Sequence, residues 1–145
     1  MEDERASLAD WELLARACQA YRSLSDAFMG QIGMHRAQAT LLCRLYEQNG
    51  MTQSEIGRQL GVQGATVTNM LQRMEESDLI RRRRDAEDNR LVRVYLTRSG
   101  EERERTITEQ FLKLQRLVFE GISEVDRALF RRVLSQMLRN MGKVG

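Results

Sequence analysis

Arginine side chains, which bind phosphate well, are concentrated in one short segment of this chain. Residues 81–93 hold six arginines against three acidic residues, and the first eighty residues contain no comparable cluster. The formal net charge of the whole chain is only +2, so the distribution of charge is more informative than its sum. A local basic stripe is typical of a surface that binds nucleic acid phosphates.

A helix with one polar face precedes the arginine segment. Val67, Leu71 and Met74 recur at helical spacing, which predicts a helix over residues 65–77 with these side chains buried. We expect the first turns of the opposite face to contact base edges in a DNA groove and Arg73 to contact a phosphate. An ordinary solvated face is the alternative. The expected DNA-binding residues on this helix are Gln63, Ala65, Thr66, Thr68, Asn69, Gln72 and Arg73.

A shorter helix lies just before this one. Thr52 followed three residues later by Glu55 forms a capping-box pattern, and Gly61 marks the end of the helix. The free backbone amides at a helix start favour an anion, so Thr52, Gln53 and Ser54 are expected to contact phosphate. Capping alone explains Thr52 equally well.

The periodicity then changes from helix to strand. Residues 79–84 and 91–96 are predicted to form two strands, and the polar residues 85–89 form the tip between them. In the second strand Val92, Val94 and Leu96 alternate with residues of the other face. Within the hairpin, Arg82, Arg84 and Arg90 are expected to contact DNA.

Long amphipathic helices flank this unit on both sides. Helices are predicted over residues 8–28, 36–48, 97–120 and 123–141, with Thr97 and Ser123 as N-caps. The first and last of these helices carry more apolar positions than one small lobe can cover, and obligate dimers place such a surplus in the interface. The expected dimerisation residues are Trp11, Leu14, Phe111, Leu129, Val133 and Met137.

A short helix, a turn, a second helix and an arginine-flanked hairpin together predict a winged helix-turn-helix. In order and spacing, the chain resembles the multiple antibiotic resistance regulator (MarR) family of bacterial transcription factors. Three stretches carry the resemblance: residues 51–56 for the bracing helix, 67–75 for the recognition helix, and Asp88-Asn89-Arg90 with Leu96-Thr97 for the wing. The resemblance covers essentially the whole chain.

The resemblance implies a mainly α-helical fold with a small β-hairpin wing, flanked by N- and C-terminal dimerisation helices. It implies one regulator domain over residues 1–145, with dimerisation helices at about 8–30 and 98–142 and a DNA-binding lobe at about 34–97. A homodimer would bind a palindromic operator in double-stranded DNA as a repressor, and a small-molecule effector would release it. The family pattern makes Arg90 a minor-groove arginine, held by a salt bridge to Asp88.

Other classes of protein receive less support from the sequence. No nucleophile–base pair, phosphate loop or metal-ligand set occurs at workable spacing, so we expect no enzyme, cofactor or metal site. A helical adaptor without DNA binding would leave the arginines unexplained. Cys18 allows a thiol-based redox sensor, but its place on an apolar seam with Trp11 and Tyr21 predicts a buried, inert thiol. His35 could line a pocket or lie at the surface.

The location of the protein is predicted from two features of the sequence. The start of the chain lacks a leader pattern, and no apolar run is long enough to cross a membrane. Two cysteines without metal-site spacing fit a reducing compartment. We therefore expect a cytoplasmic protein with no membrane partner.

Overall fold

The computed structural model describes residues 8–142 of the 145-residue chain. The first residues of the chain, from which the absence of a leader was inferred, lie outside the described part. The chain divides into two compact units between Phe111 and Leu112, and each is described by itself. No helix among the described residues is long and apolar enough to cross a membrane.

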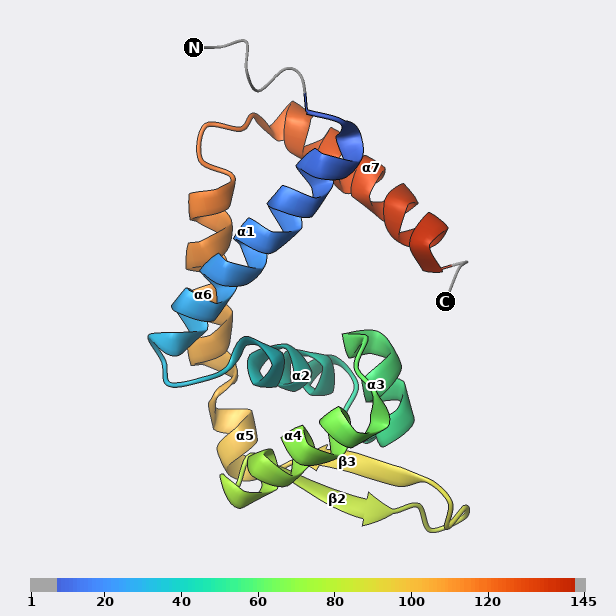
Figure 1. The fold of residues 1–145 in the computed structure, drawn as a ribbon. Coiled ribbons are helices and arrows are strands. Elements are labelled where there is room, and N and C mark those ends of the chain that lie inside the picture. The colour runs from blue at the N-terminus through green and yellow to red at the C-terminus, as the bar shows by residue number, and fades with distance from the viewer. Residues whose placement is uncertain (1–7, 143–145) are drawn as a thin grey trace. The chain divides into compact units, whose positions relative to one another are not determined.

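The fold is mainly helical with a small antiparallel sheet, as predicted (Figure 1). The elements of the first unit are α1 (Asp10–Gly30), α2 (Arg36–Glu47), β1 (Met51–Thr52), α3 (Gln53–Leu60), α4 (Gly64–Glu76), β2 (Ile80–Arg84), β3 (Val92–Leu96) and α5 (Arg98–Glu102). Helix α6 (Glu104–Val118) crosses the boundary between the units, and α7 (Glu124–Gly142) belongs to the second.

The core of the first unit is built from the predicted apolar faces. Its fully buried side chains come from α1, α2, α3, α4, the sheet and α6, and they include Met29, Leu41, Leu42, Leu45, Ile56, Val67, Leu71, Met74, Ile80, Val94 and Ile107. Burying one such side chain stabilises the fold by about 1.5–3 kcal/mol. The core therefore holds α4 on one side of the wing hairpin, with its polar face left outside.

The sheet has three strands in the order β1-β3-β2, all antiparallel. In the hairpin, Ile80 pairs with Leu96, and Arg84 pairs with Val92 at the far end. The predicted alternation along β3 is confirmed, because Val94 is fully buried and shares a face with Ile80. β1 was not predicted, since two residues are too few to show a period.

The predicted single helix over residues 97–120 is wrong, because the chain forms two helices with Arg103 between them. The Thr97 hydroxyl caps α5 by accepting a hydrogen bond from the Gly100 N–H at 3.0 Å, as predicted. The Arg103 N–H then bonds to the Gly100 carbonyl at 3.3 Å, a tighter turn than the α-helix makes. The Arg103 side chain also donates to the Ile32 carbonyl at 3.1 Å, which holds the break in place.

Gly100 is the residue of α5 that packs most closely. A Cβ atom at this position would lie 2.1 Å from the Leu79 carbonyl oxygen, a backbone atom that cannot move aside. We expect Gly100→Ala to destabilise the protein by about 1–3 kcal/mol or more, as overpacking of a core does. Thermal unfolding measures this, with Gly30→Ala as the control, because a Cβ at Gly30 meets nothing within 4 Å. Equal melting temperatures for the two variants would contradict the packing at Gly100.

The second unit centres on the start of α7. The Asp126 N–H donates to the Ser123 hydroxyl at 3.2 Å, which gives the predicted N-cap of this helix. Phe119 packs edge-to-face on Phe130 with ring centroids 4.9 Å apart, and the Arg127 guanidinium lies over Phe119 at 4.7 Å. Nevertheless no residue of α7 is buried within the described chain.

Candidate nucleic-acid interface

Helices α3 and α4 are joined by a turn whose ends are fixed by local chemistry. The capping box of Thr52 and Glu55 starts α3, with both reciprocal hydrogen bonds present. Gly61 ends it in the left-handed conformation at φ 66°, which glycine adopts without strain. The Gln53 amide donates to the Thr68 hydroxyl at 2.8 Å and so ties the start of α3 to α4.

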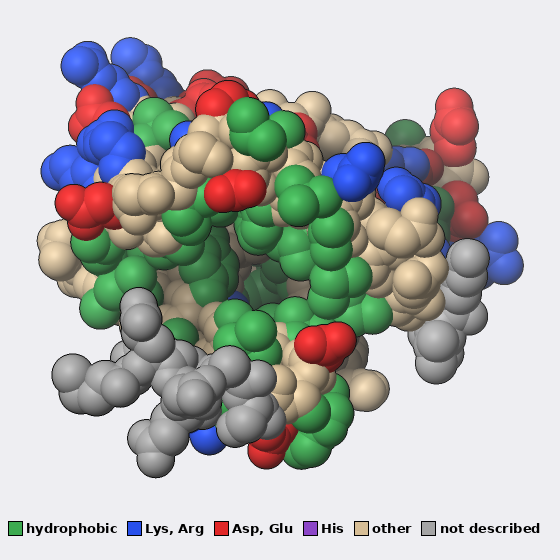
Figure 2. All heavy atoms as spheres, turned by 90° about the horizontal axis from the view of Figure 1, so that it is seen from above, with side chains coloured by type: hydrophobic (Ala, Val, Ile, Leu, Met, Phe, Trp, Pro, Cys, Tyr) green, Lys and Arg blue, Asp and Glu red, His purple; other side chains and the backbone are tan. Residues whose placement is uncertain are grey.

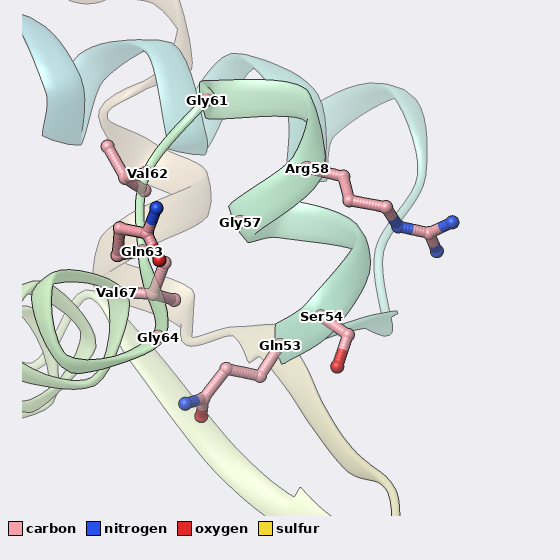
Figure 3. A pocket seen from close by; sticks show the side chains of 9 residues that line it. All are labelled: Gln53, Ser54, Gly57, Arg58, Gly61, Val62, Gln63, Gly64 and Val67. Carbon is pink, nitrogen blue, oxygen red and sulfur yellow. The ribbon is translucent and has the colours of Figure 1, made fainter. Parts of the chain in front are cut away.

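An open cleft of about 460 Å³ lies between these two helices. Figure 3 shows Gln53 extending from the start of α3 toward α4, whereas the side chain of Arg58, which also borders the cleft, extends in the opposite direction. Gln63 and Gly64 line the opposite side, at the start of α4. The predicted contact residues Gln53, Ser54 and Gln63 therefore border one concave surface.

The outward face of α4 matches the predicted recognition surface in position. The exposed residues are Gln63, Ala65, Thr66, Thr68, Asn69, Gln72 and Arg73, and the buried face is Val67, Leu71 and Met74. Gln63 is the N-cap residue of α4, and its side chain accepts no hydrogen bond from the first backbone amides of that helix. Such amides, at the positive end of the helix dipole, favour a phosphate.

Two of the predicted contact residues, Thr52 and Thr68, also make structural hydrogen bonds within the protein. The Thr52 side chain is only 6% exposed and caps α3, which favours the capping alternative over a phosphate contact. The Thr68 hydroxyl accepts from Gln53 and donates to the Gly64 carbonyl at 2.9 Å. Base readout by Thr68 would therefore require that one of these bonds be exchanged.

The face of the wing sheet that carries Ile80 also carries Arg82 and Arg84. Arg82 Nε donates to Glu75 Oε1 at 2.6 Å, which ties β2 to α4. Arg84 Nη1 donates to the Asn89 carbonyl at 2.7 Å within the hairpin. Both side chains thus help to hold the wing in position, and their contact with DNA stays a prediction.

Arg90 lies at the wing tip, where its side chain is 90% exposed. Asp88 accepts from Arg90 Nε at 3.1 Å and from Nη2 at 3.2 Å, so the ion pair expected from the family pattern is present. Hydrogen bonds from the Arg90 side chain and backbone hold the pKa of Asp88 below its ordinary value. The guanidinium is therefore oriented, yet remains open to a ligand.

Asp85 and Arg93 form the tightest ion pair of the wing, and neither was predicted as a site residue. Arg93 Nε donates to Asp85 Oδ2 at 2.5 Å, and Arg93 Nη1 donates to the Gly50 carbonyl at 2.9 Å. Asp85 Oδ1 also accepts from the backbone N–H groups of Glu87 and Asp88. This pair fixes the turn that presents Asp88 and Arg90 and anchors it beside β1.

We expect the Asp85 ion pair to stabilise the protein above about pH 4 and to lose this effect in acid. The hydrogen bond from Arg93, followed by those from the two amides, lowers the pKa of Asp85 from 3.8 to about 2. A carboxyl with a lowered pKa in the folded state stabilises it above the unfolded pKa, and this stabilisation disappears as pH falls through about 2.

Thermal unfolding of wild type and Asp85→Asn between pH 7 and pH 2 measures this. The variant should melt at a lower temperature at pH 7, and the gap should shrink as the pH falls from 4 to 2. A gap that stays constant over that range would show that the charge of Asp85 does not stabilise the wing.

The residues predicted for dimerisation differ in exposure. Trp11 is 72% exposed, and Leu129 and Val133 are each 47% exposed, whereas Phe111 packs partly against the core of the first unit. The prediction that the α1 seam buries Cys18 is wrong for the chain by itself, because Cys18 and Tyr21 are both exposed. Periodicity located the apolar stripe but not what covers it.

His35 lies at the start of α2, in a second cleft. This cleft has a volume of about 340 Å³ and is lined by His35, Ala37, Gln38, Thr66, Asn69, Met70 and Arg73. Two residues of the predicted recognition face, Asn69 and Arg73, thus share a concave surface with the N-terminus of α2. A small molecule in this cleft would touch the side chains expected to meet DNA.

The geometry defines a winged helix-turn-helix, and the comparisons with known proteins agree. The MarR family model matches residues 34–92. The organic hydroperoxide resistance transcriptional regulator of Bacillus subtilis (strain 168) is 34% identical over 113 residues, which cover 76% of this chain and 74% of that protein. YdgJ, an HTH-type transcriptional regulator of the same organism, is 29% identical over 133 residues, covering 92% and 81% respectively.

Solved structures show the same likeness. MepR of S. aureus, solved as a complex with DNA, is 27% identical with a TM-score of 0.81, and the match covers 92% of this chain and 99% of that one. The chain is thus a winged-helix DNA-binding regulator. It belongs to the MarR family of transcriptional regulators.

Proposed function

We propose that the protein is a homodimeric repressor that binds a palindromic operator in a sequence-specific manner and is released by a small-molecule effector. The observation that supports this proposal most strongly is that the first unit exposes two polar surfaces. One is the outward face of α4, and the other is the wing tip with Arg90 oriented by Asp88. In this docking mode α4 enters the major groove, and Arg90 contacts the minor groove or its phosphates.

Dimerisation is supported by the unpartnered apolar surface of the terminal helices. Exposed hydrophobic side chains of α1 and the second unit include Trp11, Leu13, Tyr21, Leu117, Val125, Leu129, Phe130, Val133, Leu138 and Met141. Figure 2 shows many hydrophobic side chains at the surface seen from above. Large apolar side chains that recur along a helix and stay exposed are typical of a surface that a partner covers. A second copy of the chain is the partner that a two-fold operator requires.

The alternative of an adaptor without DNA binding is not favoured. It would leave an exposed, oriented Arg90 and an uncapped α4 without a role.

An effector is proposed to bind in the cleft lined by His35, Asn69 and Arg73, because a ligand there would compete directly with DNA for the last two side chains. Repression and its release are consistent with such competition.

Asn69 provides the sharpest test of sequence-specific binding. Its exposed amide can donate to N7 and accept from N6 of adenine, and it carries no charge to attract phosphate. We expect Asn69→Ala to cost about 1–3 kcal/mol at the preferred operator and to relax discrimination at one adenine of each half-site. Non-specific affinity should hardly change.

The measurement is a binding-site selection with wild type and Asn69→Ala at the same salt concentration. Gln59→Ala, which changes another exposed amide on α3, serves as the matched control. Identical base preferences and stringency for all three proteins would show that Asn69 belongs to a solvated face and reads no base.

A further inference from the structure

The face of the wing sheet opposite to Ile80 and Arg82 carries arginines that the DNA-binding surface described above does not use. The strand register places Arg81 opposite Tyr95 and Arg83 opposite Arg93. Successive residues of a strand point to opposite faces, so Arg81 and Arg83 share the face that turns away from Glu75 and α4. Both arginines are exposed.

This face is concave. A cleft of about 380 Å³ is lined by Asn49, Arg81, Arg83, Tyr95, Leu96, Thr97 and Arg98. Three arginines from two elements, β2 and α5, therefore border one site. The volume lies within the range of small-ligand sites.

The three arginines are poorly neutralised by their surroundings. Among the described residues, Arg81 and Arg83 take part in no ion pair. Arg98 pairs with Glu102 at 3.2 Å, but its side chain is 92% exposed, so solvent screens that contact. Arg93 on the same face is satisfied by Asp85 and Gly50. Like charges gathered in one cleft repel one another, and an anion relieves this repulsion.

Neutral donors also border the cleft. The Asn49 Oδ1 atom accepts from the Leu96 N–H at 2.9 Å, which fixes the orientation of the amide and leaves its own N–H groups as donors. The Tyr95 side chain adds a hydroxyl on the same face. The planar fork of arginine fits the oxygens of a phosphate group better than it fits a single-atom anion such as chloride.

We propose that the cleft bordered by Arg81, Arg83 and Arg98 is a second anion-binding site of this protein, and that it takes a phosphate group. The site is separate from the α4 surface and does not depend on base readout. The phosphate comes from a free phosphorylated compound or from the backbone of duplex DNA beside the operator. Both sources present the same chemical group, and the two experiments below distinguish between them.

The first experiment is isothermal titration of the full chain with pyrophosphate at constant ionic strength. Saturable binding at one site per protomer is expected for wild type. Arg81→Gln/Arg83→Gln should weaken it at least tenfold. Both substituted side chains are exposed, so the variant should remain folded, as thermal unfolding checks. Arg105→Gln/Arg116→Gln, which removes the same charge from exposed positions outside the cleft, should bind as wild type does.

The second experiment compares a selected operator duplex with the same duplex lengthened by about one helical turn at each end. If the phosphate belongs to DNA, the longer duplex binds wild type more tightly, and Arg81→Gln/Arg83→Gln loses that gain but still binds the short duplex. The proposal is overturned if this variant equals the Arg105→Gln/Arg116→Gln control in both experiments. If wild type and both variants all fail to bind the short operator, the proposed repressor function is contradicted. The pyrophosphate titration would still show whether the cleft binds a phosphate group.

Discussion

Replacing Arg90 with alanine is expected to weaken binding to specific and non-specific duplexes alike. The guanidinium is 90% exposed at the wing tip and is oriented by Asp88, so it is available to a phosphate or to the minor groove. A lost charge-assisted hydrogen bond costs about 1.5–3 kcal/mol, or roughly ten- to a hundredfold in affinity for each contact. The slope of log affinity against log salt should flatten by about one unit for each protomer.

Arg105→Ala is a matched control for this variant. Arg105 is also 90% exposed and donates to Glu109 at 3.0 Å, much as Arg90 donates to Asp88 at 3.1 Å. Fluorescence anisotropy over a range of salt concentrations should separate the two variants. If Arg90→Ala keeps the affinity and the salt slope of Arg105→Ala, the wing tip does not touch DNA.

A charge placed in the apolar surface of α7 should have the other large effect. Val133 is 47% exposed in the chain and is proposed to be covered by a second copy. Val133→Asp would bury an unpaired carboxylate in each half of a two-fold interface, which costs several kcal/mol. We expect a monomer that has lost on the order of a hundredfold in operator affinity, because the second half-site no longer binds intramolecularly.

Ser135→Asp introduces the same charge at an exposed polar position of α7 and should leave the dimer intact. Sedimentation analysis gives the oligomeric state of both variants, and circular dichroism reports whether they fold. A wild-type monomer, or a dimer that survives Val133→Asp, would show that this face of α7 is not the interface.

Much of the fold could be predicted because its helices bury one clear apolar stripe each. The helix predicted over residues 65–77 is Gly64–Glu76, and the capping box at Thr52 begins α3 as expected. The break at Arg103 could not be predicted, since the bond that holds it, from the Arg103 side chain to the Ile32 carbonyl, joins distant parts of the chain. Pattern alone carries no information on such a contact.

The candidate DNA-binding site could likewise be predicted only in part from the sequence. The alternation of residues along β2 indicated that its arginines divide between two faces, but not which of them already have partners. Arg82 is held by Glu75 of α4, and Arg93 by Asp85 across the hairpin. The first pair depends on how β2 packs against α4, and the second on how the wing turn folds back on the strands. Arg90 could be placed because its partner Asp88 lies only two residues away.

The most direct test of DNA recognition by this protein is a binding-site selection with the wild-type chain and random duplex DNA. Two recognition helices related by a two-fold axis should return an inverted repeat whose half-site centres lie about one helical turn apart. The affinity for that sequence should exceed the affinity for random duplex by about a thousandfold or more at physiological salt. Recovery of no enriched sequence, or of a single half-site without its inverted copy, would contradict a dimer that reads DNA through α4.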